Sequence, residues 1–112
     1  KGLLGTKELN KALQQELNPH REGEAEKNSM GAIFRIGDRV MQIKNNYDIY
    51  WEKKENGEVE VGNGVFNGET GTILNINEKE KNICVKFDDE KLVWYEFFSH
   101  LERQLNLPFL KS

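Results

Sequence analysis

The sequence is short of the residues from which disulfides and metal sites are built. Cys84 is its single cysteine, so no disulfide can form within the chain, and a cysteine cluster for zinc is excluded. The two histidines, His20 and His100, have no acidic or cysteine partner at the spacing of metal ligands. We therefore expect no metal site, and we expect Cys84 to be a small residue in a strand.

Long hydrophobic runs are also missing. The longest apolar runs hold only a few residues, whereas roughly 20 are needed to cross a bilayer. With 37% hydrophobic and 31% charged residues, the 112-residue chain has the composition of one soluble domain with a modest core. We expect it to be cytoplasmic.

A basic excess is missing too. The formal net charge is −3, which is not the positive footprint of an autonomous nucleic-acid-binding domain. Any contact with DNA must therefore be local or shared with other domains. The chain starts with Lys1-Gly2 and has its first methionine at position 30, so we expect it to be a segment of a longer protein.

No catalytic motif is present. Four glycines punctuate residues 62–71, but no Lys-Ser or Lys-Thr pair follows them, and a Walker phosphate loop needs one. Asp88 and Asp89 stand in a charged run that is typical of a solvated turn, and no nucleophile has a base at a suitable spacing. The chain alone should have no catalytic residues, bind no cofactor or metal, and not be an enzyme.

What the sequence does contain is a helical pattern followed by short β patterns. Thr6 is a suitable N-cap, leucines recur at positions 9, 13 and 17, and Pro19 ends the pattern. The segment that follows is charged and has no large apolar residue, which is typical of a flexible linker. We therefore expect a short N-terminal helix, separated by this linker from the β patterns.

The β patterns predict a small barrel. Residues 83–88 alternate between apolar and polar, as in a strand with one buried face. Asn56-Gly57 is a strong two-residue hairpin signal and predicts a hairpin insertion over residues 49–64. The predicted fold is mostly β, a small SH3-like five-stranded barrel with an inserted hairpin, preceded by the short helix. We divide the chain into the helix and approach segment (1–18), a flexible linker (19–31), the barrel (32–98) and a C-terminal tail (99–112).

Two motifs and the helix before them resemble a known family. The sequence GDRVMQIKNNYD at residues 37–48, followed by VFNGETGTI at 65–73, resembles the SH3-like domain in the second motor half of RecD/TraA-family DNA helicases. This is the family of the exodeoxyribonuclease V alpha chain. The leading GTKELNKALQQELNP is similar to the segment just before that domain, so the resemblance covers residues 5–97. The long hairpin, the acidic linker and a tail without a helicase motif depart from the family pattern.

The resemblance implies a parent protein that unwinds DNA with ATP and magnesium, in DNA repair or recombination. This segment would be an accessory domain that handles single-stranded DNA or braces the motor lobes. Its partners would be that DNA and the remaining motor domains, and alone it would be monomeric. A second hypothesis is a stand-alone β-barrel that binds RNA or a peptide. A reading frame that extends upstream and encodes a Walker loop would exclude this second hypothesis.

The candidate DNA contact is the corner that follows the strand of residues 39–44. Cations hold single strands together with aromatic rings on which bases stack, and residues 44–47 combine a lysine, two asparagines and a tyrosine. In the alternative interpretation Gln42 bonds to backbone in the core, the asparagines bond to the turns and Tyr47 caps the core. The candidate residues are Arg39, Gln42, Lys44, Asn45, Asn46, Tyr47 and Asn67.

The missing phosphate loop generates a first prediction. The chain alone should hydrolyse ATP no faster than a buffer blank, because nothing in it can hold the phosphates and magnesium. A coupled ATPase assay with and without single-stranded DNA checks this. DNA-stimulated hydrolysis by the purified chain would contradict the absence of catalytic residues.

Overall fold

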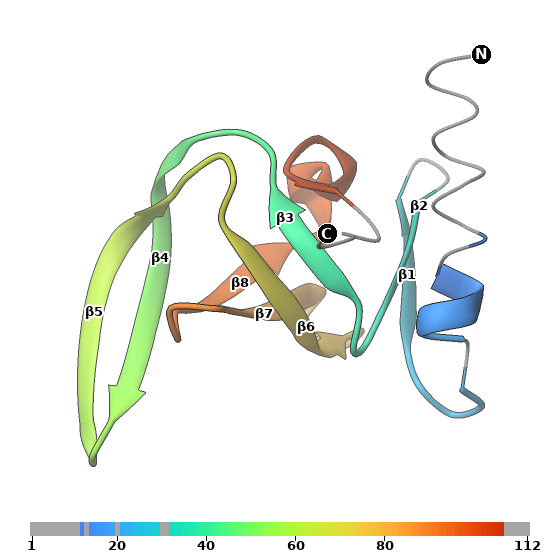
Figure 1. Cartoon of the computed structure of the whole chain (residues 1–112), viewed down its shortest axis with the longest axis horizontal. Helices are drawn as coiled ribbons and strands as arrows, with labels where there is room; N and C mark the ends of the chain where they lie inside the picture. The colour runs from blue at the N-terminus through green and yellow to red at the C-terminus, as the bar shows by residue number, and fades with distance from the viewer. Residues whose placement is uncertain (1–11, 13, 20, 30–31, 107–112) are drawn as a thin grey trace.

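The computed structural model describes residues 12, 14–19, 21–29 and 32–106 (Figure 1). Ala12 and residues 14–17 are helical. The expected helix start at Thr6, the leucines at positions 9 and 13, and His20 lie outside the described residues. The strands are β1 (Glu26–Ser29), β2 (Ala32–Arg35), β3 (Arg39–Gln42), β4 (Asn46–Glu55), β5 (Glu58–Val65), β6 (Thr70–Asn77), β7 (Asn82–Phe87), β8 (Leu92–Glu96) and β9 (Leu105–Asn106), and two 3-10 helices are η1 (Phe97–Ser99) and η2 (Leu101–Arg103).

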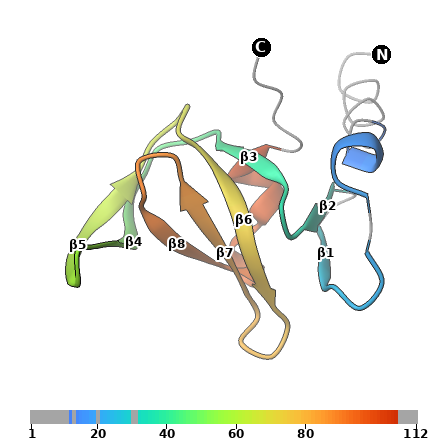
Figure 2. The same ribbon diagram turned by 60° about the horizontal axis from the view of Figure 1, so that its bottom comes forward.

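One antiparallel sheet carries the fold. Its strand order is β5-β4-β8-β7-β6-β3-β9, whereas β1 and β2 pair only with each other. Five of its strands, β3, β6, β7, β8 and β9, wrap around one core, and the 3-10 helices join β8 to β9 (Figure 1, Figure 2). The β4–β5 hairpin is inserted between β3 and β6. The prediction of an SH3-like fold with an inserted hairpin and a preceding helix is therefore confirmed.

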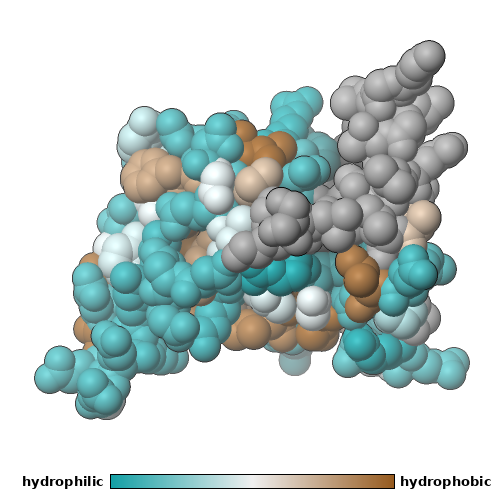
Figure 3. Space-filling view, in the orientation of Figure 1, coloured by the Kyte–Doolittle hydropathy of each residue, from teal (hydrophilic) through white to brown (hydrophobic). Residues whose placement is uncertain are grey.

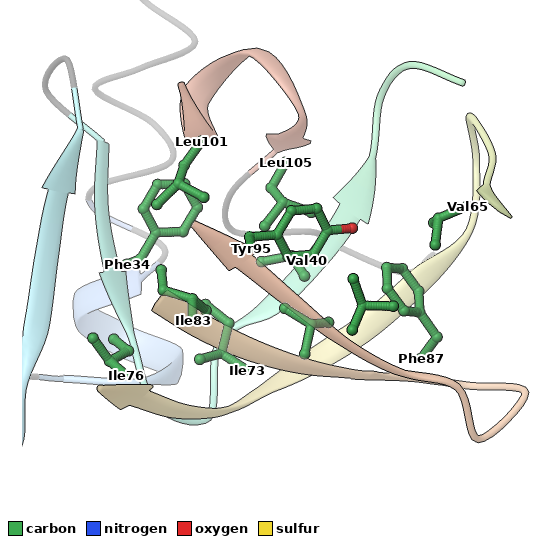
Figure 4. Packing of buried hydrophobic residues seen from close by; sticks show 12 residues of the cluster. Phe34, Val40, Val65, Ile73, Ile76, Ile83, Phe87, Tyr95, Leu101 and Leu105 are labelled. Carbon is green, nitrogen blue, oxygen red and sulfur yellow. The ribbon is translucent and has the colours of Figure 1, made fainter. Parts of the chain in front are cut away.

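Alternate residues of β7 and β8 form the centre of the core (Figure 4). Ile83, Val85 and Phe87 from β7 are buried, as are Val93 and Tyr95 from β8, while the residues between them face outward. The alternation expected for β7 is confirmed. The cluster is completed by Phe34, Val40, Val65, Ile73, Ile76, Leu101 and Leu105.

Two parts of the core depart from simple alternation. In β6, Ile73 and Ile76 both face the core although they are three residues apart, because the pairing with β7 shifts register between Ile73 and Asn75. After β8, Leu101 and Leu105 return to the core, and β9 pairs with the end of β3. The segment treated as a tail thus provides a further strand at the end of the sheet, which is not closed into a barrel by the described strands.

The segment treated as a linker also contains ordered structure. Glu26–Ser29 forms β1, which pairs with β2 from Glu26 opposite Arg35 to Ser29 opposite Ala32. The sequence pattern is uninformative here because β1 carries no apolar alternation. The division of the chain at residues 18, 31 and 98 stays a prediction, and side chains from both sides of these limits pack together.

The inserted hairpin turns where Asn56-Gly57 predicts it. Both residues have positive φ, +51° and +80°, as a type I′ turn requires. At the base of the hairpin the Trp51 ring lies directly over Gly62, where a Cβ would come within 2.4 Å of the ring. A side chain at position 62 would therefore displace Trp51, which packs against the core.

A buried carboxylate joins the helical segment to the β2–β3 turn. Asp38 follows Gly37, whose φ of +94° makes the turn between β2 and β3, and its side chain is only 2% exposed. The carboxylate accepts hydrogen bonds from the Arg35 amide at 2.8 Å, from Gln14 Nε2 at 2.7 Å and from Asn18 Nδ2 at 2.7 Å. Gln14 belongs to the helical segment and Asn18 directly follows it, so Asp38 fixes that segment against the β2–β3 turn.

Arg35 forms a second connection at the same place. Its guanidinium forms an ion pair with Glu26 of β1, and it donates to the Asn18 carbonyl and to Gln15 Oε1, both at 3.0 Å. One buried cation therefore links β2 to β1 and to the helical segment. Arg35 is thus committed to the fold.

The Asp38 network predicts a specific loss of stability. Asp38→Asn should lower the free energy of unfolding by about 1–3 kcal/mol, because an NH2 group would face donors. Asp48→Asn is the matched control: that side chain is exposed, and the change should stay within about 0.5 kcal/mol. Urea unfolding followed by circular dichroism measures both, and equal effects would contradict the role of Asp38.

The same carboxyl predicts a pH dependence. Burial raises the pKa of Asp38 above 3.8, and the hydrogen bonds from Asn18, Gln14 and Arg35 offset only part of this. The folded protein therefore binds this proton more readily than the unfolded chain. Through Asp38 alone, the free energy of unfolding should rise as the pH falls from the raised folded-state pKa towards 3.8. The difference in the free energy of unfolding between wild type and Asp38→Asn should therefore increase as the pH falls through this range. A difference that decreases as the pH falls would contradict the prediction.

Candidate nucleic-acid interface

The candidate residues gather where β3 leads into β4 and β5 leads into β6. These two connections lie side by side, since Gly68 donates its amide to the Gln42 carbonyl at 2.8 Å and Asn67 donates its amide to Asn45 Oδ1 at 2.9 Å. We call the surface formed by residues 44–47 and 66–67 the corner. Figure 3 shows apolar surface at the upper left, where the hairpin meets the rest of the sheet, within a mostly hydrophilic face.

Gln42 lies beneath the corner and is fully buried, with 0% exposure. Its Nε2 donates to the Lys44 carbonyl at 2.8 Å, and its Oε1 accepts from the Tyr95 hydroxyl at 2.5 Å. The backbone N–H of Gln42 donates to the Glu69 carbonyl at 2.8 Å. Gln42 therefore has the internal partners that a buried polar side chain requires, and it supports the corner from inside.

Arg39 is held away from the corner by an ion pair. Its guanidinium donates to both oxygens of Asp88, each at 2.9 Å, and to Thr72 Oγ1 at 3.1 Å. The hydrogen bond to Asp88 raises the pKa of Arg39, so the guanidinium stays charged and paired. A phosphate at this guanidinium would compete with Asp88 for it.

The asparagines order the backbone of the corner. Asn45 Oδ1 accepts the Asn67 amide, as described above, and its Nδ2 lies 3.5 Å from the Tyr47 hydroxyl. Asn46 donates from Nδ2 to Gln104 Oε1 at 3.1 Å and accepts the Asp48 amide at 3.2 Å. Gln104 belongs to the segment treated as a tail. It lies 58 residues after Asn46, so sequence patterns could not predict this contact.

Two aromatic rings form the exposed surface of the corner. Tyr47 is 67% exposed and Phe66 is 40% exposed, and their rings meet edge to face with centroids 5.4 Å apart and planes at 63°. Phe66 is absent from the residues selected by sequence, although its place beside the Asn-Gly turn was a usable signal. Gly64, with φ of +110°, leaves room for it, because a Cβ there would lie 2.9 Å from the Phe66 ring.

An ionic network holds the turn that carries Phe66. Glu69 accepts the Phe66 amide at 2.9 Å and receives Lys91 Nζ at 2.5 Å, and Lys91 also contacts Asp89 at 2.8 Å. Burial alone would lower the pKa of Lys91, but the bonds to Asp89 and Glu69 outweigh it and the pKa is raised. Lys91 is therefore a buried structural cation.

Lys44 is the cation that the corner leaves available. It is exposed, and it forms no ion pair with any residue that the structure describes. The structure thus brings together Lys44, Asn45, Tyr47 and Asn67 at the surface and adds Phe66. It places Arg39, Gln42 and the polar atoms of Asn46 in contacts within the chain.

The described part of the chain offers little else of chemical character. It contains no group of three or more His, Cys, Asp or Glu side chains that could hold a metal ion. Residues 62–71 form the end of β5, a turn and the start of β6, which is not a phosphate-binding loop before a helix. Burial raises the pKa of the Cys84 thiol, which disfavours the reactive thiolate. No described helix is long and apolar enough to cross a membrane.

Comparison with known proteins supplies the family context of this surface. Residues 9–87 match the family model described as the ATP-dependent RecD-like DNA helicase SH3 domain. The matched stretch includes β1 to β7 and with them the whole corner. No solved structure matches the chain.

The support of the corner by Gln42 can be tested through its partner. Tyr95→Phe should lower the free energy of unfolding by about 1–3 kcal/mol, since Gln42 Oε1 would lose its buried donor. Tyr50→Phe removes an exposed hydroxyl that donates to Glu52 and should change it by no more than about 0.5 kcal/mol. Chemical denaturation compares the two variants. An unchanged free energy of unfolding in Tyr95→Phe would show that the hydrogen bond does not stabilise the structure beneath the corner.

Proposed function

The chain belongs to the family of SH3 domains of ATP-dependent RecD-like DNA helicases, and we propose that its corner contacts single-stranded DNA within such a helicase. The observation that carries the proposal is the exposed Tyr47–Phe66 ring pair in the same corner as Lys44, which forms no ion pair with a described residue. Rings next to a cation are the elements with which proteins hold unpaired bases and their phosphates. The family match favours this function over that of a stand-alone RNA or peptide module.

The ring pair is suited to stacking. An edge-to-face contact with Phe66 leaves much of the Tyr47 ring uncovered, in agreement with its high exposure. Asn45 restrains the same ring through its contact with the hydroxyl, so less side-chain freedom is lost when a base binds. Stacking of this kind tolerates any base, which fits a domain that handles DNA irrespective of sequence.

The charge distribution makes the contact weak when the domain is alone. Lys44 is one cation in a chain of net charge −3, and Arg35, Arg39 and Lys91 are committed to internal pairs. The hairpin of residues 49–61 carries four glutamates against two lysines, and Figure 1 shows its tip at the far end of β4 and β5 from the corner. A strand lying on the corner would therefore avoid these acids.

In this proposal the domain acts jointly with other parts of a cytoplasmic helicase. Those parts would bind ATP and magnesium and would supply most of the affinity for DNA, since the sequence has no Walker loop and the described residues form no group of metal ligands. Membership of an exodeoxyribonuclease V-like enzyme that works in repair or recombination belongs to the same proposal. The domain would keep one or two bases in place between steps of the motor.

The proposal predicts how binding responds to two substitutions. Tyr47→Ala should weaken binding of a short oligothymidylate by about 1–3 kcal/mol, which is the range for one stacked base. Lys44→Ala should reduce the slope of log K against log salt by about 0.7, since one phosphate contact is lost. Titration of the 15N-labelled chain, followed by NMR, measures both.

Tyr50→Ala is the control for Tyr47→Ala. Tyr50 is also an exposed tyrosine, but it lies within β4 outside the corner, so its removal should leave DNA affinity unchanged. Chemical shift changes that avoid residues 44–47 and 66–67, or equal losses in the two alanine variants, would overturn the proposal.

A further inference from the structure

Strand β5 leaves one side of its backbone open along the edge of the sheet. Among the strands that the structure describes it is the terminal one of the sheet and pairs only with β4, from Asn46 opposite Val65 to Glu55 opposite Glu58. Figure 1 shows the hairpin projecting away from the rest of the sheet, with no other element beside β5. An open edge of this length is a template for a further strand.

The side chains along this edge alternate regularly. Val59 and Val61 are 57% and 56% exposed and share one face, while Glu58 and Glu60 occupy the other. Exposed valines on a projecting hairpin contribute nothing to the core cluster. The edge therefore presents an apolar row and an acidic row to any strand that pairs with it.

The acidic row carries three glutamates, Glu55, Glu58 and Glu60, and one cation, Lys53, and none of these glutamates forms an ion pair within the described part of the chain. Glu55 lies directly opposite Glu58, which is an unfavourable like-charge pair, and neither they nor Glu60 form an ion pair with a described residue. Lys53, opposite Glu60, has its Nζ 5.6 Å from the centre of the Trp51 ring instead. The three carboxylates are therefore free to bind basic groups from outside.

The hairpin tip is also hollowed on its surface. A hollow of about 280 Å³ is lined there by Lys53, Glu55, Asn56, Glu58, Val59 and Glu60. Three carboxylates against the single lysine leave the hollow with a negative balance, which favours a lysine or arginine side chain as occupant. The base of the hairpin is firmly held, because Trp51 packs over Gly62 and pairs with Val93, so little order must be gained on binding.

Charge decides between the possible occupants of the edge. A second copy pairing antiparallel through β5 would set glutamates against glutamates, which disfavours self-association. DNA is disfavoured by the same acids. A protein segment that alternates basic and β-branched residues satisfies both rows at once, with its cations on the glutamates and its apolar side chains beside the valines.

We propose that the free edge of β5 binds an extended basic segment of a protein partner as an added strand. This surface is separate from the corner and its use does not depend on DNA binding there. Backbone hydrogen bonds would supply the pairing, and the glutamates would select the charge. In this proposal the β4–β5 hairpin, called the arm below, is the part of the domain that binds the partner.

The test is an NMR titration of the 15N-labelled chain with a synthetic peptide of alternating lysine and valine. We expect shift changes in residues 58–63 and a dissociation constant at least about threefold weaker for Glu58→Lys/Glu60→Lys. Glu78→Lys/Glu80→Lys makes the same charge change on the β6–β7 turn, where both acids are exposed, and should bind like wild type.

Peptide controls separate strand pairing from charge attraction. The same peptide with every second backbone amide N-methylated keeps its charges but loses donors, and it should not bind. Equal binding of the methylated peptide, shift changes outside β5, or concentration-dependent pairing of β5 with itself would each overturn the proposal. Tyr47→Ala should leave peptide binding unchanged, so failure of this test is distinct from failure at the corner.

Discussion

The hydrogen bond from Tyr95 to Gln42 is the interaction on which both the fold and its candidate surface depend. It joins β8 to β3 within the core, and the other end of the Gln42 side chain holds the Lys44 carbonyl. The backbone of Gln42 meanwhile binds Glu69 and Gly68, so the two connections that form the corner converge on one residue. Because the Gln42 side chain is fully buried and both of its polar atoms have partners, this network holds the surface above it in place.

A second constraint is the commitment of cations to structure. Arg35, Arg39 and Lys91 each pair with carboxylates of neighbouring segments, so these three cations are held within the fold. Free acids gather instead on the inserted hairpin. The physical consequence is a division of surfaces: aromatic rings with one lysine at the corner, and an acidic, open strand edge on the arm.

Much of the fold could be predicted because its signals are local. The turn at Asn56-Gly57, the Gly37-Asp38 turn and the alternation of β7 depend on near neighbours in sequence. β9 and the return of Leu101 to the core could not be predicted, since they are fixed by contacts with residues about 60 positions away. The same holds for the candidate site. The asparagines and Tyr47 could be selected because they follow one another in sequence, whereas the contacts of Phe66 and Gln104 are visible only in the fold.

The central claim is that an unpaired base stacks on the corner, and intermolecular nuclear Overhauser effects test it most directly. With oligothymidylate bound to the labelled chain, the account predicts contacts between thymine methyl protons and the ring protons of Tyr47 and Phe66. Thymine contacts confined to any other surface, with none to either ring, would contradict it.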